Sequence, residues 1–189
     1  MIDRGNLKDL YPLSPMQEGM LFHALMEPGS PAYLEQMGFQ INGALDAERF
    51  QQALDALVQR HEILRTSFVH EKTRRPLQAV LKVRPVLMSV EDLRSAPVEL
   101  RDRRIADHLE QDRNTPFDLG RHPLLRLALF RVEDQVWKLI WTHHHILMDG
   151  WCVGILQSEF LEIYRAIEKG NDSGRCHLAV YPIDHAVKH

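Results

Sequence analysis

The chain has 189 residues, of which 44% are hydrophobic, so it can bury the core of one globular domain or of one lobe of a larger domain. Its 23 basic and 26 acidic residues give a net charge of -3, which argues against a nucleic acid or an anionic membrane as a partner. No apolar run has the length of a membrane span or the form of a signal peptide, and the two cysteines, Cys152 and Cys176, have no metal-binding or redox spacing. We therefore expect a soluble, cytoplasmic protein.

The first predicted helix begins at Ser14–Gln17, where a serine cap, a proline at the first helical position and a capping-box glutamine follow one another. Pro28-Gly29 ends this helix, and Gly19 inside it indicates a close approach of another backbone. A half-buried strand is predicted from Ala32 to Ile41, and Glu35 breaks its pattern on the apolar side. The first helix has a predicted buried stripe of apolar residues at helical spacing: Met16, Met20, Leu21, Ala24 and Leu25.

The middle of the chain predicts a second helix after Asp46, then a hairpin of Thr66–Val69 with Leu77–Lys82, and a short strand at Val86–Val90. A highly charged helix from Pro97 to about Asn114 has few apolar side chains, so we expect it on the outside of a sheet. The second helix has a predicted buried face made of Phe50, Ala53, Leu54, Leu57 and Val58.

The last third of the chain predicts a loop at Thr115–Gly120, anchored by Phe117 and Leu119, and two neighbouring strands. Leu124–Val132 is apolar on both faces, which is typical of a central strand, and Val136–His143 is its expected partner. A final helix from Trp151 to about Lys169 has a predicted buried face of Cys152, Leu156, Phe160, Ile163, Tyr164 and Ile167.

Three consecutive histidines, His143–His145, end the second of these strands and precede Asp149-Gly150 at the start of the final helix. Histidine has the unperturbed pKa nearest neutrality, so this segment is a candidate acid/base site. Strand alternation predicts that His143 and His145 share one face and that His144 points to the other, where it would serve in packing. Because neighbouring strand residues point to opposite faces, we predict no metal site here.

Three segments together resemble the first three signature motifs of nonribosomal peptide synthetase condensation domains: Tyr11–Met20, Arg60–Phe68 and His144–Trp151. They stand in the family's order and at family-like separations, and they span most of the chain. Tyr181–Val187 resembles the fourth motif faintly, departing in its spacing and at Lys188. The first motif looks more like that of the class that accepts a D-configured donor.

The resemblance implies an α/β fold, namely one lobe of a two-lobed architecture like chloramphenicol acetyltransferase, with a mixed sheet covered by helices. Residues 1–170 would form the N-terminal lobe, and residues 171–189 a linker or crossover towards a C-terminal lobe. The implied reaction joins an aminoacyl or peptidyl thioester donor to an aminoacyl acceptor, both carried on the phosphopantetheine of carrier-protein domains. The implied partners are these carriers, the C-terminal lobe and a neighbouring adenylation domain. No directly bound cofactor is expected.

The resemblance also implies roles for single residues. His145, the second histidine of its motif, would act as a base or orient the acceptor amine, and His144 belongs to the same motif. Free N–H groups at the helix start near Gly150 could polarise a substrate carbonyl. Asp149 would hold the loop through a buried ion pair with Arg60 or Arg65, although an aspartate before glycine at a helix start is most simply an N-cap or a turn former.

Several alternatives remain open on the sequence. An epimerisation domain shares the fold and the His-His-x-x-x-Asp-Gly pattern. A CoA-dependent acyltransferase of the same fold is a second alternative, which the first two motifs argue against, and a binding module without catalysis is a third. If the chain is one lobe, we expect it to fold alone but not to join substrates, and to expose an apolar face where the second lobe docks.

Overall fold

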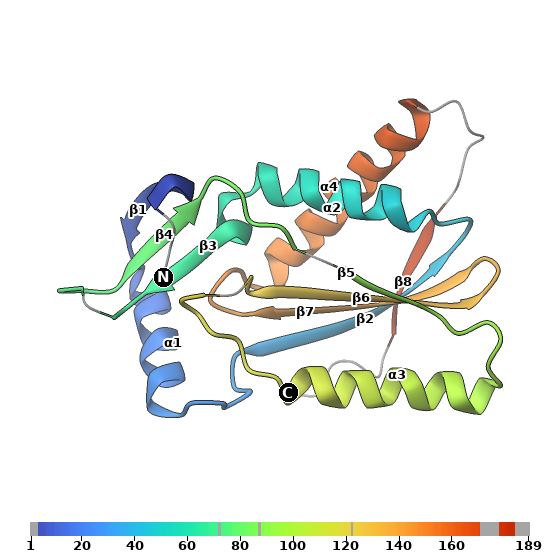
Figure 1. The fold of residues 1–189 in the computed structure, drawn as a ribbon, viewed down its shortest axis with the longest axis horizontal. Coiled ribbons are helices and arrows are strands. Elements are labelled where there is room, and N and C mark those ends of the chain that lie inside the picture. The colour runs from blue at the N-terminus through green and yellow to red at the C-terminus, as the bar shows by residue number, and fades with distance from the viewer. Residues whose placement is uncertain (1–3, 72, 87, 122, 171–177, 184–189) are drawn as a thin grey trace.

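The computed structural model describes residues 4–71, 73–86, 88–121, 123–170 and 178–183. Helices and strands alternate along these residues (Figure 1). In chain order the elements are η1 (Arg4–Asn6), β1 (Leu7–Pro12), α1 (Pro15–Met26), β2 (Leu34–Asn42), α2 (Ala47–Arg60), η2 (Glu62–Arg65), β3 (Thr66–Val69), β4 (Leu77–Leu81), β5 (Met88–Asp92), α3 (Val98–Arg113), β6 (Leu125–Glu133), β7 (Val136–His144), α4 (Gly150–Gly170) and β8 (Ala179–Ile183).

Two sheets organise these elements. The larger sheet has the strand order β5-β6-β7-β2-β8, in which β5 runs parallel to β6 and the other neighbours are antiparallel. The smaller, antiparallel sheet has the order β1-β4-β3. The predicted mixed sheet is therefore present. β7 lies at its centre, between β6 and β2, so the histidines that end β7 are held by backbone hydrogen bonds on both sides.

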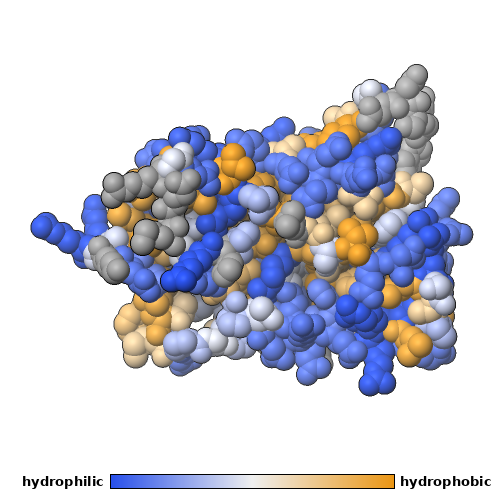
Figure 2. All heavy atoms as spheres, viewed as in Figure 1, coloured by the Kyte–Doolittle hydropathy of each residue, from blue (hydrophilic) through white to orange (hydrophobic). Residues whose placement is uncertain are grey.

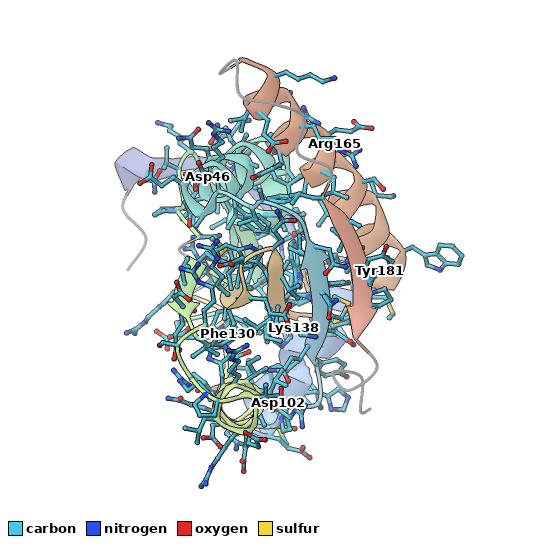
Figure 3. The ribbon with its side chains drawn as sticks, turned by 90° about the vertical axis from the view of Figure 1, so that its right-hand side faces the viewer. Asp46, Asp102, Phe130, Lys138, Arg165 and Tyr181 are labelled. Atoms are coloured by element: carbon cyan, nitrogen blue, oxygen red, sulfur yellow. The ribbon has the colours of Figure 1, made fainter. Side chains whose placement is uncertain are left out.

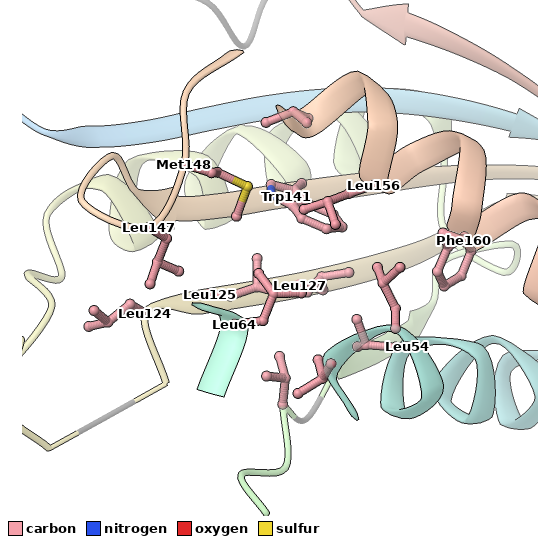
Figure 4. Packing of buried hydrophobic residues seen from close by; sticks show 14 of the residues in the cluster. Leu54, Leu64, Leu124, Leu125, Leu127, Trp141, Leu147, Met148, Leu156 and Phe160 are labelled. Carbon is pink, nitrogen blue, oxygen red and sulfur yellow. The ribbon is translucent and has the colours of Figure 1, made fainter. Parts of the chain in front are cut away.

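Helices cover both faces of the larger sheet. Figures 1 and 3 show α2 and α4 on one face, and α3, which carries the labelled Asp102, on the other. The main core lies under α2 and α4, where Leu54, Trp141 and Phe160 meet (Figure 4). A smaller cluster of Leu93, Ala128, Phe130, Val132 and Ile140 packs with Ile105 and Leu109 of α3. The prediction of a charged helix on the outside of a sheet is confirmed.

Elements with a clear pattern form as predicted. Ser14 caps α1 and Gln17 completes the capping box. β3 pairs with β4 as the predicted hairpin, and β6 pairs with β7. In α2 all five residues of the predicted face are buried: Phe50, Ala53, Leu54, Leu57 and Val58. No helix among the described residues is both long and apolar enough to cross a membrane.

Other expectations were wrong. Met16 and Leu25 of α1 are exposed, and only Met20 and Leu21 of the predicted stripe are buried. Cys152 is exposed in the first turn of α4, where Val153 is the buried residue instead. A side chain at Gly19 would meet no atom within 4 Å, so no described residue requires a glycine there. β1 was not predicted. Its side chains are mostly exposed, so its sequence lacks a strand alternation.

The C-terminal segment, which was expected to be a linker or crossover, contains one described strand. Within residues 171–189, Ala179–Ile183 forms β8 and pairs antiparallel with β2 at the edge of the larger sheet. This part of the segment therefore extends the sheet of the lobe. The comparison of Tyr181–Val187 with the fourth motif falls largely outside the described residues, which end at 183. Cys176 lies outside them as well.

Candidate functional site

The candidate site lies where β7 ends and the chain turns towards α4. The register pairs Glu35 of β2 with His143 and Leu34 with His144. Beyond the last strand residue, the backbone N–H of His145 still donates to the carbonyl of Tyr33, at 2.8 Å. The three histidines are thus fixed to β2, and Glu35 shares the sheet face of His143, because directly opposed residues of a pair point to the same side.

His143 and His144 are buried, as residues at the centre of a covered sheet should be. Burial lowers the pKa of each imidazole to about 4, and the neighbouring charge of His145 acts in the same direction. Both are therefore neutral near pH 7. His144 Nδ1 accepts a hydrogen bond from the backbone N–H of Ile146, at 3.1 Å. The ring lies 6.0 Å from Tyr33 and 6.4 Å from Phe117, between centroids. This is the packing role predicted from strand alternation.

His145 is the histidine of the three that reaches solvent. About a third of its side chain is exposed, at 32%, whereas His143 and His144 are 1% and 7% exposed. Its Nδ1 is enclosed and lies 3.6 Å from Oε1 of Glu35, and no described residue gives that nitrogen a hydrogen bond. The exposed part of the ring is therefore the part away from Nδ1. An imidazole held in this way can present Nε2 to a reacting group.

Apolar anchors fix the loop after His145. Ile146, Leu147 and Met148 are 2%, 6% and 7% exposed, and Figure 4 shows Leu147 and Met148 pointing into the main core. The backbone of Ile146 also accepts a hydrogen bond from Gln17 of α1, at 3.4 Å. The short apolar link in the sequence thus has a clear function: it places His145 at a rigid edge of the core.

Asp149 acts as the N-cap of α4. Its Oδ1 accepts a hydrogen bond from the backbone N–H of Cys152, at 3.0 Å, and this bond lowers the pKa of the carboxyl. The side chain is exposed. The simpler of the two roles considered for Asp149, helix capping, is the one that the structure contains.

The expected ion pair of Asp149 with Arg60 or Arg65 is absent among the residues that the structure describes. Arg60 binds Glu159 of α4 at 3.1 Å instead. Arg65 is 3% exposed, donates to the carbonyls of Leu81 and Gln59, and lies 3.5 Å from Glu62. Both guanidinium groups thus have partners other than Asp149, and this prediction was wrong.

Gly150 is the first residue of α4. A Cβ atom built there would meet no atom within 4 Å, and its φ is not in the left-handed region. No described residue therefore requires a glycine at this position. The space beside Gly150 stays free for an atom from outside these residues, and the polarising role of the helix start remains a prediction.

A polar network that sequence reasoning missed lies under the histidine strand. Asp112 of α3 is 9% exposed, and its carboxylate binds Arg126 Nε at 2.6 Å and accepts from the hydroxyl of Thr142. Gln36 of β2 donates to the same carboxylate at 3.1 Å. Arg126 in turn lies over the ring of Phe117, 4.0 Å from its centroid. The charged pattern of α3 gave no sign that one aspartate would turn inward.

Two hollows of the described residues lie near the histidine segment, and His145 lines neither. A groove of about 880 Å³ runs between α1, β3 and the segment 116–121, and a small one of about 40 Å³ borders His144, Arg113 and Phe117. Within the described part of the chain, no three histidine, cysteine or acidic side chains are arranged to hold a metal ion. His145 is reached by solvent through the exposed third of its side chain.

Relatives of known name are similar over most of this chain. Gramicidin S synthase 2 of Brevibacillus brevis is 44% identical over 166 residues, which are 88% of this chain and 4% of that protein. A plipastatin synthase polypeptide of Bacillus subtilis (strain 168) is 43% identical over 170 residues, which are 90% of this chain and 7% of that protein. The chain therefore spans less than a tenth of the length of these two relatives.

Solved structures share the fold. The starter condensation domain of rhizomide synthetase matches with a TM-score of 0.78 and 24% identity, over 89% of this chain and 42% of that chain. The first condensation domain of the CDA synthetase matches with a TM-score of 0.79 and 23% identity, over 90% of this chain and 42% of that chain. The expected α/β lobe of a chloramphenicol acetyltransferase-like fold is confirmed. The family model described as the condensation domain matches residues 7–186, so the chain belongs to the condensation domain family.

Proposed function

We propose that this chain supplies the histidine-bearing half of an amide-forming site in nonribosomal peptide synthesis. The observation that supports it best is the placement of His145. This residue follows the central strand of a condensation-family lobe, and its side chain is one-third exposed. Its backbone N–H is held by the carbonyl of Tyr33, and its Nδ1 is enclosed beside Glu35. A nucleophilic amine and a thioester carbonyl need such a positioned base between them.

In the proposed reaction one histidine, His145, carries the proton from the acceptor amine to the leaving thiolate. The acceptor amine attacks the carbonyl carbon of the donor thioester and forms the C–N bond, while its proton passes to Nε2 of His145. The C–S bond then breaks, and the imidazolium returns the proton to the departing phosphopantetheine thiolate. His145 begins and ends neutral. The resemblance of Tyr11–Met20 supports a donor of D configuration, which parallel assays with D and L donors would test.

The second half of the site would come from outside these residues. The chain covers 42% of each of the two solved condensation-domain chains, and the side chain of His145 is 32% exposed. Figure 2 shows apolar side chains gathered over α1. Exposed apolar residues include Met16, Phe22 and Met26 on α1, and Trp151 and Ile155, one turn apart, on α4. We assign these faces to the rest of a condensation domain, since both helices start beside the 146–149 loop.

The test compares amide formation by this chain alone with that by a synthetase module that contains it. Both receive a donor and an acceptor loaded on phosphopantetheinylated carrier domains. We expect product from the module and none from the chain alone. Rapid dipeptide formation by the isolated chain would contradict the proposal. Capture of the loaded carrier, compared with calorimetry of a CoA thioester, separates a carrier-dependent enzyme from a CoA-dependent acyltransferase.

A further inference from the structure

Glu35 is an anomaly in the packing of β2. Its neighbours on the same sheet face are apolar, and Phe39 and Ile41 are buried in the main core. A carboxylate on such a face loses hydration without gaining packing, so a polar contact is expected for it. Its side chain is 41% exposed, which shows that it stands at the rim of the core beside His145.

The contact of Glu35 is with one particular nitrogen. Oε1 lies 3.6 Å from Nδ1 of His145, and that nitrogen is enclosed and without a hydrogen bond from any described residue. This distance is longer than a hydrogen bond of about 2.7–3.2 Å. Glu35 is 41% exposed and has three side-chain torsions, so its carboxylate has the freedom to move towards Nδ1. Hydrogen bonds of catalytic groups are often long before substrate binds.

The acid of the histidine motif is not available for this task. Asp149 accepts a hydrogen bond from Cys152 and caps α4. His143, which shares the face of His145, is neutral and has both ring nitrogens enclosed without a described partner. Glu35 is therefore the carboxylate placed to hold the ring of His145.

We propose that Glu35 is a positioning residue that holds His145 in the tautomer with the proton on Nδ1 and the lone pair on Nε2. In the proposed arrangement Nδ1–H donates to the carboxylate once the two groups close to hydrogen-bond distance, which satisfies a buried donor and leaves Nε2 free to accept the amine proton. The other tautomer would point a bare Nδ1 at a carboxylate, and the two acceptors repel each other. The proposal rests on the proposed function, in which His145 takes that proton.

The first test reads the tautomer directly in the 189-residue chain and needs no activity. Long-range 15N–1H NMR correlations report which nitrogen of His145 carries the proton, at about pH 8.5, two units above the reference pKa of histidine. We expect the Nδ1–H form in the wild-type chain and in Glu35→Gln, whose amide oxygen can still accept. Glu35→Leu should revert to the Nε2–H form. Glu133→Leu, which removes an exposed strand glutamate at the far end of the sheet, should leave His145 unchanged.

The second test measures amide formation by the module that contains the chain. We expect Glu35→Leu to lower kcat by about 10–100-fold with little change in KM for the acceptor, and Glu35→Gln to recover part of the loss. An Nε2–H tautomer in the wild-type chain, or a wild-type kcat for Glu35→Leu, would overturn the role of Glu35. Wild-type activity of His145→Ala would instead overturn the proposed function, whatever the tautomer, so the two failures are distinguishable.

Discussion

Asp112 of α3 lies 2.6 Å from Nε of Arg126 on β6, and the same carboxylate accepts from Thr142 on β7, one residue before the histidines. The pair is part of a network that also includes Gln36 of β2 and joins α3 to three neighbouring strands beneath the candidate site. Because Asp112 is 9% exposed, its charge depends on these partners for compensation.

The network predicts a graded loss of stability. Asp112→Ala strands Arg126 and leaves the donors of Gln36 and Thr142 unpaired, so we expect it to lower the free energy of unfolding by about 2–4 kcal/mol. Asp112→Asn keeps an acceptor and should lose less. Urea denaturation measures both, with the exposed Asp102→Ala of the same helix as the matched control. Equal midpoints for Asp112→Ala and the control would contradict the role of the network.

The capping role of Asp149 makes a prediction that differs from that of an ion pair. Asparagine caps helices about as well as aspartate, so Asp149→Asn should melt close to the wild type, whereas Asp149→Ala should melt about 2–4 °C lower. If Asp149 instead neutralised a buried charge, Asp149→Asn and Asp149→Ala would lower the melting temperature by similar amounts. Melting curves at pH 7 decide between the two. A large loss in Asp149→Asn would show that the carboxylate's charge, and not its cap, holds the loop.

The buried histidines predict that stability depends on pH. The folded pKa of His143 and of His144 is about 4, below the unfolded value of about 6.5, so the unfolded chain binds more protons between these values. Their contribution to stability is complete above pH 6.5 and is lost as the pH falls towards 4. Each histidine should account for roughly 2 kcal/mol between pH 7 and pH 5.

Replacing one of them isolates this effect. His143→Leu removes two enclosed nitrogens that have no described partner, so we expect it to be at least as stable as the wild type at pH 7 and to show a shallower loss on acidification, by about one proton. The exposed His23→Gln serves as the control and should keep the wild-type slope. Denaturation midpoints from pH 7 to pH 5 report the slope. An unchanged slope in His143→Leu would mean that His143 is charged in the folded protein.

A substitution at Gly150 should affect activity without lowering stability. A Cβ at this position meets nothing within 4 Å, so Gly150→Ala should leave the melting temperature unchanged or slightly raised. In the module, we expect the same variant to slow amide formation, since the methyl group fills the space beside the helix start. Gly154→Ala, one turn further along α4, is the control for helix propensity. Full activity of Gly150→Ala would remove the helix start from the account.

Local patterns predicted the elements because each pattern reflects contacts within one segment. The five apolar residues of α2 recur at helical spacing and are all buried, and the Ser14 capping box forms as written. β1 escaped prediction because its side chains face solvent and its partner β4 is distant in sequence. In α4 the predicted face is buried at Leu156, Phe160 and Tyr164, but Cys152 in the first turn is exposed.

The candidate site was predictable in its position but not in its contacts. The histidines follow a strand pattern, so their alternation and the burial of His144 could be anticipated. The predicted ion pair of Asp149 with Arg60 or Arg65 was wrong, because a contact between distant segments depends on tertiary packing, which the spacing of residues in the sequence does not show. Glu35 did stand out as a charge on an apolar face. Its link to His145 required the register between β2 and β7, which only the structure provides.

The most direct measurement is the single-turnover rate of amide formation from loaded carriers by the module that carries His145→Ala. General base catalysis of this kind contributes about 10²–10⁴-fold, so we expect the rate to fall by that factor while the exposed His23→Ala control keeps the wild-type rate. A folded His145→Ala module that forms the amide at the wild-type rate would contradict the account.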